Sequence, residues 1–280
     1  MDFISEIRDF LSQNGITATE TVNDGFSVFV CGTVNVIPVP VRSMSMEDAE
    51  SQPVRLCDAV SGLSGRKVLV PEDMWRGRHN ASPNRSQTKH ATMRGRPEMM
   101  MPRLLAQLGR FRSVFARNTV VSRIGKEAAA SFLDRWHSYR DAASRYRYGV
   151  FTKAGELVAV ASFSSGRTWV KEGRTVRSYE WVRYASLPDV RVVGGMGKVL
   201  KAFVEDVHPD DIMSYADMEW TDGAVYERLG FIEDGIRPPV QFVIDPVSWV
   251  RTALSRADSV SGMFYHLNMG SVKYRLARWH

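Results

Sequence analysis

Cysteine and long apolar runs are what this sequence has least of. It contains two cysteines, Cys31 and Cys57, in 280 residues. Two cysteines cannot build a disulfide framework, so we expect a protein of the reducing cytoplasm. No run of 18 apolar residues occurs, so no segment is predicted to span a bilayer. The N-terminal stretch MDFISEIRDFLSQ is amphipathic and lacks an apolar core, and we therefore expect neither a signal peptide nor a membrane anchor.

Metal-binding patterns are also missing. His79 and His90 have no cysteine at ligand spacing, so no zinc site is expected. What the sequence does contain is ordinary for a soluble globular protein, with 44% hydrophobic and 24% charged residues. Its length allows one large domain or two ordinary ones.

Positive charge is concentrated in one segment. Residues 76–117 contain ten Lys or Arg and one acid, Glu98, whereas the whole chain has a net charge of +6. The rest of the chain is therefore slightly acidic, and the segment predicts a polyanionic partner, with DNA favoured. The alternative is a solvated basic loop. Six bases near Trp75 are the expected phosphate contacts: Arg76, Arg78, Arg85, Lys89, Arg94 and Arg96.

The first part of the chain, residues 1–117, reads as a small α/β module. Apolar residues at helical spacing predict an N-terminal helix, and FSVFVCGTVNVIPVPV predicts one or two buried strands broken by Gly32. KVLVPEDMW is expected to be a strand that runs into a loop. Residues 79–97 are rich in helix breakers and predict a long loop, which MMMPRLLAQLGRF follows as a helix. We expect the domain boundary near residue 118.

The second part, residues 118–280, has a more regular pattern. VFARNTVVSRIG predicts a strand, EAAASFLDRWHSY a helix, and YRYGVFTKAGELVAVASFSS a β-hairpin that turns at residues 153–155. SYEWVRYAS and DIMSYADMEW read as strands, GAVYERLGF as a short helix and PVQFVID as a last strand. The tail SWVRTALSRADSV is expected to be helical. The predicted fold class is α/β, with a mixed, mostly antiparallel sheet flanked by helices in this part.

The stretch VVGGMGKVLKAF, at residues 192–203, combines glycines with the start of an amphipathic helix. A P-loop is excluded because Lys198 is followed by Val199 instead of Ser or Thr, and because no glycine lies five residues before Gly197. A dinucleotide fingerprint is excluded because Leu200 stands where the third glycine is needed. The remaining pattern is a strand and a glycine turn that opens a helix, whose N–H groups can bind an anion.

This pattern resembles the GCN5-related N-acetyltransferase (GNAT) superfamily, in which the turn cradles the pyrophosphate of acetyl-coenzyme A. The resemblance extends over residues 118–246 through the order of elements and the ending of IMSYADMEWTDGAVYERLGF. The family usually opens the motif with Arg or Gln, where this sequence has Val192. The resemblance implies an acetyl-CoA or related acyl-CoA site formed by Val193, Gly194, Gly195, Met196, Gly197 and Lys198.

A finer resemblance is to GNAT-like domains of phages and mobile elements, including the Mom DNA-modification proteins. It rests on Trp136–His137, EWVRYA, SYADMEW and VYERLGF. Residues 1–117 resemble part of the Vsr-like and homing-type nucleases. The resemblance is to the stretch that follows the nuclease core, and it rests on the segments VPEDMWRGR and LLAQLGRFRSVFARN. The expected strands lack the carboxylates that would hold magnesium, with Asp24 the only acid nearby. We therefore expect a degenerate nuclease module kept for structure or DNA contact.

Four residues are the expected catalytic groups. Tyr226 stands where the superfamily commonly has a general acid for the leaving thiolate, although a packed tyrosine is the alternative. Asp217 could orient or deprotonate an amine, or cap the following turn. Arg183 should meet a carboxylate such as Asp217 or a substrate anion. His137 is a candidate base, or else a packed histidine, and Ser214 is a further hydrogen-bond donor.

Together these features predict an acyl-CoA-dependent N-acyltransferase whose acceptor could be a base in DNA, with adenine the first candidate. Such a base would have to leave the stack to react. The alternative is a non-catalytic nucleic-acid-binding protein that keeps a GNAT-like scaffold. A protein, a tRNA or a small amine as acceptor fits the same residues.

Overall fold

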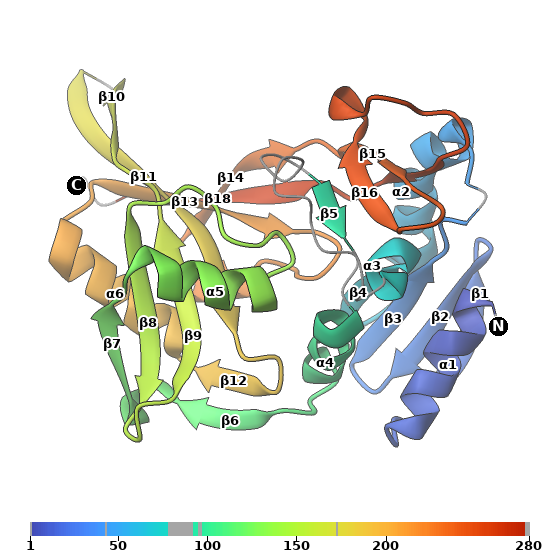
Figure 1. Cartoon of the computed structure of the whole chain (residues 1–280), viewed down its shortest axis with the longest axis horizontal. Helices are drawn as coiled ribbons and strands as arrows, with labels where there is room; N and C mark the ends of the chain where they lie inside the picture. The colour runs from blue at the N-terminus through green and yellow to red at the C-terminus, as the bar shows by residue number, and fades with distance from the viewer. Residues whose placement is uncertain (1, 43, 78–91, 95–96, 172, 278–280) are drawn as a thin grey trace. The chain divides into compact units, whose positions relative to one another are not determined.

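The structure, a computed structural model, describes residues 2–42, 44–77, 92–94, 97–171 and 173–277; for 92–94 and 171 it describes the backbone alone. The chain divides into two compact units (Figure 1). The first unit comprises Met1–Leu108, Asp217–Asp222 and Ile236–Ser271, and the second comprises Gly109–Ala216, Gly223–Gly235 and Val272–His280. The units therefore differ from the single boundary expected near residue 118, because the first unit includes two segments from late in the sequence.

The first unit is built on a four-stranded sheet in the order β1-β2-β3-β4. The first three strands are antiparallel, and β4 joins β3 in parallel. Pro38 lies inside β3 but past the residues that pair with β2, so its missing N–H interrupts no bond of that ladder. The strands are β1 Thr19–Asn23, β2 Phe26–Cys31, β3 Val34–Val39 and β4 Arg66–Pro71.

Helices cover both faces of this sheet. On α1, which spans Phe3–Gln13, the predicted apolar stripe packs with Val36 and Val68 of the sheet. On α2, which spans Met46–Ser61, Leu56 packs on the opposite face. The N-terminal helix is thus confirmed, whereas α2 was not predicted.

The other elements of the first unit correct two predictions. The segment after β4 is a helix, α3 Glu72–Arg76, and not the expected loop. The tail expected to be helical instead forms a strand, β16 Val250–Ala253, followed by a short 3₁₀ helix, η2 Leu254–Arg256. In β16, the buried Arg251 and Ala253 alternate with more exposed residues, which is the spacing of a strand. Helix α4, Pro97–Gln107, forms as predicted. A second sheet has the strand order β17-β15-β16-β5, and its other strands are β17 Phe264–Leu267, β15 Gln241–Ile244 and β5 Thr92–Arg94. Residues 79–91 and 95–96 of the expected long loop lie outside the described residues.

The described part of the second unit is dominated by an eight-stranded sheet in the order β14-β18-β13-β11-β9-β8-β7, with β10 paired to β11. The predicted hairpin is β8–β9, and β11 pairs antiparallel with β9 but parallel with β13. This confirms the mixed α/β fold class. The strands are β7 Thr119–Arg123, β8 Tyr146–Thr152, β9 Leu157–Phe163, β10 Arg167–Lys171, β11 Arg174–Ser186, β13 Asp211–Asp217, β14 Ile232–Arg237 and β18 Ser271–Ala277.

Two helices flank this sheet on opposite faces (Figure 1). On α5, which spans Lys126–Trp136, Leu133 packs with Val160 of β9. On α6, which spans Gly195–Val207, Phe203 stacks face to face on Phe163 of β9, with ring centroids 3.9 Å apart. Because Val160 and Phe163 lie on opposite sides of β9, the sheet forms the middle of three layers.

Short elements complete the second unit. β12 (Val190–Val193) pairs in parallel with β6 (Arg112–Phe115), and a 3₁₀ turn, η1 (Ala116–Asn118), links β6 to β7. Helix α7 (Ala224–Arg228) follows β13, as predicted. No helix in the described ranges is long and apolar enough to cross a membrane.

Candidate active site

The glycine-rich turn of the second unit joins β12 to α6. Gly194, just before the helix, has a φ of 78°, a left-handed conformation that glycine adopts without steric strain. Val193 and Gly194 are exposed, and Gly195 begins the helix. A ligand can therefore reach the turn from solvent.

The first turn of α6 presents unbonded N–H groups. A helix leaves its first N–H groups without intrahelical acceptors, and no side chain caps this one. The N–H groups of Gly195, Met196 and Gly197 have no acceptor in the part of the chain that the structure describes. Together with the helix dipole, these groups make the turn suitable for a phosphate or another anion.

Gly195 lies too close to its neighbours to carry a side chain. A Cβ at this position would be 2.7 Å from the Tyr184 hydroxyl oxygen and 2.7 Å from a Val192 methyl group. Val192 itself is buried in the core, which accounts for an apolar residue at this position. Tyr184 was not predicted as a site residue, since in the sequence it is one more alternating residue of a strand. Burial raises the pKa of Tyr184, so its hydroxyl stays protonated.

Lys198 differs from the expectation. Its N–H donates to the Gly194 carbonyl at 3.0 Å, as the first regular bond of the helix. Its ammonium donates to the carbonyls of Ala116, at 2.8 Å, and Thr119. Lys198 therefore ties α6 to the η1 turn, and contact of its ammonium with a phosphate stays a prediction.

Strands β11 and β13 diverge near the glycine turn. They pair over residues 178–180 and 211–213, and past these residues the described part of β13 has no register with β11. β11 continues along β9 to Ser186, with an irregularity between Trp181 and Arg183. The two strands thus separate toward their carboxyl ends, from which β11 leads through β12 into the turn.

Tyr226 and Ser214 lie where these strands separate. The Ser214 Oγ is 3.0 Å from the Trp181 carbonyl oxygen and 2.9 Å from the Tyr226 hydroxyl oxygen. The Tyr226 ring stacks on Tyr274 with centroids 5.2 Å apart, and it meets Phe231 edge-on. Burial raises the pKa of Tyr226 above its ordinary value. The phenol is therefore fixed in place and holds its proton at neutral pH, as a general acid must.

Arg183 and His137 have structural partners. Arg183 donates to the carbonyls of Arg140, at 2.9 Å, and Tyr139, at 3.5 Å, and burial lowers its pKa. The expected pairing of Arg183 with Asp217 stays a prediction, since the two residues belong to different units. The His137 Nδ1 accepts the Tyr139 N–H at 3.0 Å, which requires this nitrogen to be unprotonated. Both side chains shape the loop after α5.

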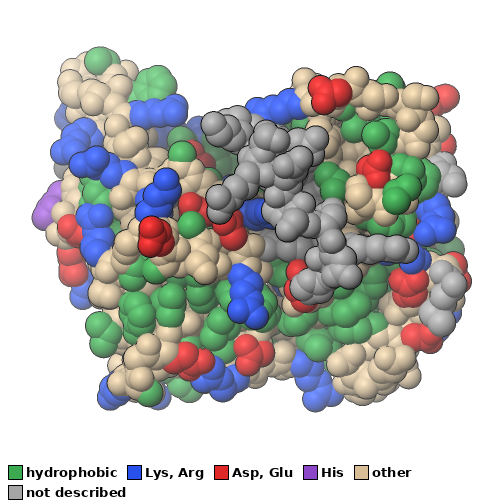
Figure 2. Space-filling model, viewed as in Figure 1, with side chains coloured by type: hydrophobic (Ala, Val, Ile, Leu, Met, Phe, Trp, Pro, Cys, Tyr) green, Lys and Arg blue, Asp and Glu red, His purple; other side chains and the backbone are tan. Residues whose placement is uncertain are grey.

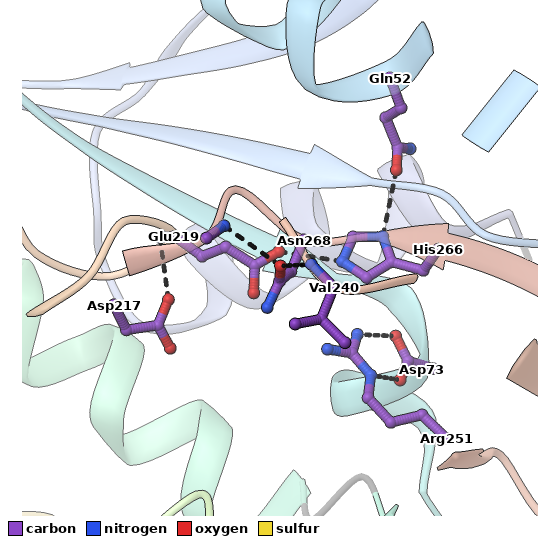
Figure 3. Close-up of polar contacts among 9 residues, drawn as sticks. Gln52, Asp73, Asp217, Glu219, Val240, Arg251, His266 and Asn268 are labelled. Atoms are coloured by element: carbon purple, nitrogen blue, oxygen red, sulfur yellow. Dashed lines mark hydrogen bonds and ion pairs between the residues drawn. The ribbon is translucent and has the colours of Figure 1, made fainter. Parts of the chain in front are cut away.

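Asp217 belongs to the first unit, whereas Tyr226 and Ser214 belong to the second. Its Oδ1 accepts the Glu219 N–H at 3.0 Å, which is the turn-capping alternative (Figure 3). Burial and the charge of Glu219 raise the pKa of Asp217 to about 6, against the effect of Arg103. A carboxyl that titrates near neutral pH can exchange a proton with an amine, and the catalytic role of Asp217 stays a prediction.

The first unit contains a buried polar network that the sequence did not reveal (Figure 3). The His266 Nε2 is 2.9 Å from Glu219 Oε1, and its Nδ1 is 3.1 Å from Gln52 Oε1. Arg251 makes two bonds to Asp73. No group of three metal-ligating residues occurs among the described residues. The sequence carries no signal for this network, because each partner comes from a distant segment.

The predicted phosphate contacts lie largely beyond what the structure describes. Arg78, Arg85, Lys89 and Arg96 fall outside the described residues, and of Arg94 only the backbone in β5 is described. Arg76 makes ion pairs with Glu6, at 2.8 Å, and Glu72, at 2.7 Å. Its charge is thus compensated within the first unit, and its contact with a phosphate stays a prediction.

Comparisons with known proteins give only a partial likeness. No protein-family model matches the sequence, and no curated protein does. Among solved structures, the chain is similar to the ribosomal-protein-S18-alanine N-acetyltransferase of Escherichia coli, at 15% identity and a TM-score of 0.35, over 58% of this chain and 95% of that one. It is also similar to the spermidine/spermine N-acetyltransferase of Vibrio cholerae, at 10% identity and a TM-score of 0.34, over 58% and 94%.

A third similar structure is described as histone acetyltransferase HPA2 and related acetyltransferase, from Corynebacterium glutamicum. It shares 14% identity at a TM-score of 0.31, and the match covers 48% of this chain and 65% of that one. TM-scores of this size carry no conclusion about activity. The function proposed below therefore rests on the residues of the turn and of the diverging strands.

Proposed function

We propose that the second unit is a GNAT-type N-acyltransferase domain that uses acetyl-CoA or a related acyl-CoA. The observation that carries the proposal is the uncapped first turn of α6, next to two parallel strands that separate. The turn suits a pyrophosphate, and an extended thioester would lie between the strands where they separate. Tyr226 lies at that separation with its hydroxyl held by Ser214.

The residues of the turn suit the cofactor. The N–H groups of Gly195, Met196 and Gly197 would hold the pyrophosphate oxygens. Tyr184 and Val192 approach Gly195 so closely that the start of α6 has no room for a side chain at this position. When bound, coenzyme A supplies a thioester whose acyl group an amine can accept.

The side chains near the strand separation would assist the transfer. Tyr226 keeps its proton until the leaving sulfur develops negative charge, and proton delivery of this kind contributes roughly 10²–10⁴-fold to rate. Ser214 fixes the orientation of the phenol. Within the second unit, His137 is a weak candidate to take the proton of the amine, since its Nδ1 is occupied. Asp217 belongs to the first unit, and its role as a base stays a sequence prediction.

For the acceptor, we propose an amino group of a base in DNA, with adenine first. The support is the basic segment 76–117, which fits the phosphate backbone. The alternative function is a non-catalytic nucleic-acid-binding scaffold. This alternative is favoured by the hydrogen bonds that Arg183, His137 and Lys198 make to backbone groups of the protein. It is opposed by the unbonded N–H groups in the first turn of α6 and by the protonated hydroxyl of Tyr226.

Calorimetric titration with acetyl-CoA separates these two functions. We expect the wild type to bind and Gly195→Glu to lose binding, since the new side chain would collide with Tyr184 and Val192 and displace the first turn of α6. Gly125→Glu is the matched control. Gly125 precedes α5, has an ordinary φ of −68°, and has no atom within 4 Å of an added Cβ.

Circular dichroism spectra of both variants would establish that they fold. If the folded wild type does not bind acetyl-CoA, the acyltransferase proposal fails and the scaffold alternative stands. For the acceptor, nucleosides from DNA of cells expressing the wild type or Gly195→Glu would be compared by mass spectrometry. A base with an added acyl mass in the wild type alone is expected, and an unmodified profile would exclude DNA as acceptor.

A further inference from the structure

A two-stranded ribbon extends from the large sheet of the second unit. β10 pairs antiparallel with the first half of β11, from Arg167 opposite Ser178 to Lys171 opposite Arg174. β10 has no other strand partner among the described elements. Figure 1 shows this hairpin projecting beyond the helices that cover the sheet. Its strands are therefore open to a partner.

The hairpin is strongly basic. Between positions 167 and 177 the sequence has four Lys or Arg and one acid, Glu172. Arg167 and Arg174 are exposed and make no ion pair in the described part of the chain. Arg177 is exposed too, and its guanidinium donates to the Tyr179 hydroxyl at 2.9 Å. The positive charge is thus available to an anionic partner.

An aromatic ring lies among these cations. Trp169 is 51% exposed and makes no ring contact with a described residue, and the adjacent Val170 is 76% exposed. Arg167 and Trp169 are two positions apart in one strand, so their side chains point to the same face. Lys171 is two positions after Trp169 in β10, and Arg174 of β11 lies directly opposite Lys171. Arg174 therefore shares the same face. Figure 2 shows hydrophobic and basic side chains next to each other at this end of the unit.

We propose that the β10–β11 hairpin binds single-stranded nucleic acid. Trp169 stacks on a base, and Arg167 and Arg174 pair with the phosphates on either side of it. The half-exposed Trp169 offers a ring on which a base can stack, and an arginine on each side matches a chain that alternates planar bases with anions. A single strand is favoured because the bases of a duplex already stack on one another. This inference does not depend on acyl transfer, since the hairpin needs no cofactor to bind.

Fluorescence anisotropy with labelled oligonucleotides of about 20 nucleotides tests the inference, without acyl-CoA present. Single-stranded DNA, single-stranded RNA and duplex DNA form the three arms, and the two single-stranded arms identify which nucleic acid is preferred. We expect Trp169→Ala to weaken single-strand binding at least about fivefold and Trp169→Phe to retain most of it. Replacing Arg167 and Arg174 by glutamine should make the salt slope, which is the slope of log K against log salt concentration, shallower by about 0.7 for each lost phosphate contact.

Lys126→Gln is the matched control, since Lys126 is an exposed cation at the start of α5 in the same unit. It should leave the affinity and the salt slope within error of the wild type. The inference is overturned if the wild type binds no single strand, or if Trp169→Ala binds as well as wild type. It is also overturned if poly-glutamate competes as well as the single strand, which would indicate an acidic protein as partner.

Discussion

The Arg251 guanidinium makes two hydrogen bonds of 2.6 Å to the carboxylate of Asp73, across 178 positions of sequence. Both side chains are buried, with 1% and 0% exposure. The pair joins β16 to α3, so it holds a late segment of the chain in the first unit.

Breaking this pair should strongly destabilise the first unit. Arg251→Met leaves the Asp73 carboxylate buried without its cation, and we expect a loss of about 3–5 kcal/mol in the free energy of unfolding. Urea titration followed by circular dichroism measures it. Arg112→Met is the control, because the Arg112–Glu156 pair is about half exposed; it should cost less than about 1 kcal/mol. Equal losses in the two variants would contradict a special role for the buried pair.

Tyr226→Phe should lower kcat without changing the affinity for acetyl-CoA. In the proposed reaction the phenol donates its proton only as the thiolate leaves, so its loss should reduce kcat by roughly 10²–10⁴-fold. Because burial raises the pKa of Tyr226 above 10.0, the wild-type activity should not fall through its ionisation below about pH 10. Steady-state kinetics against pH, together with calorimetry, would check both points. A Tyr226→Phe enzyme with unchanged kcat would assign the ring to packing.

Asp217 should make stability depend on pH. The carboxyl ionises near 3.8 when unfolded and near 6 when folded, because of burial and the charge of Glu219. Between these values the folded protein binds a proton that the unfolded chain lacks, so the free energy of unfolding falls as pH rises through this window. Asp217→Asn stays neutral and keeps an oxygen for the Glu219 N–H. Its Tm relative to wild type should therefore rise from about pH 4 to pH 7.

Thermal unfolding at several pH values measures this difference. Asp58→Asn, an exposed carboxylate on α2, is the control and should show a constant difference. If the Asp217→Asn difference is equally constant, the carboxyl does not titrate as the burial of Asp217 requires.

Lys198→Met should affect stability more than cofactor binding. The ammonium is bonded to the carbonyls of Ala116 and Thr119, so its loss should cost about 1–3 kcal/mol while the Kd for acetyl-CoA changes less than about threefold. Lys201→Met on the same helix is the control, since Lys201 is 75% exposed. A large loss of affinity at unchanged stability would instead make Lys198 a phosphate ligand.

The sequence predicted best those elements whose pattern is local. The spacing of Phe3, Ile7 and Leu11 identifies α1, and all three residues are buried. The β8–β9 hairpin and the glycine turn before α6 were identified in the same way, from alternation and from neighbouring glycines. The helix α2 was missed because Pro53 lies inside it and reads as a breaker.

Elements that depend on distant partners could not be predicted. The tail around Arg251 read as a helix, since nothing nearby indicates that this arginine is buried against Asp73. The position of Tyr184 against Gly195 likewise depends on how β11 passes the start of α6. In the candidate site, the sequence identified Tyr226 and Ser214 as candidates but not their contact, which requires β13 and α7 to be placed in space.

The interrupted first unit has a consequence for synthesis. When a ribosome has translated the first 108 residues, the strands β15, β16 and β17 do not yet exist, and the carboxylate of Asp73 lacks its cation. At about 5–20 residues per second, the 178 positions that separate Asp73 from Arg251 take roughly 10–35 s to translate. During that interval β7 to β14 of the second unit are made, but β18, which lies between β14 and β13 in its sheet, comes after Arg251 in the sequence. Neither unit can therefore complete its sheets until almost the whole chain has been translated.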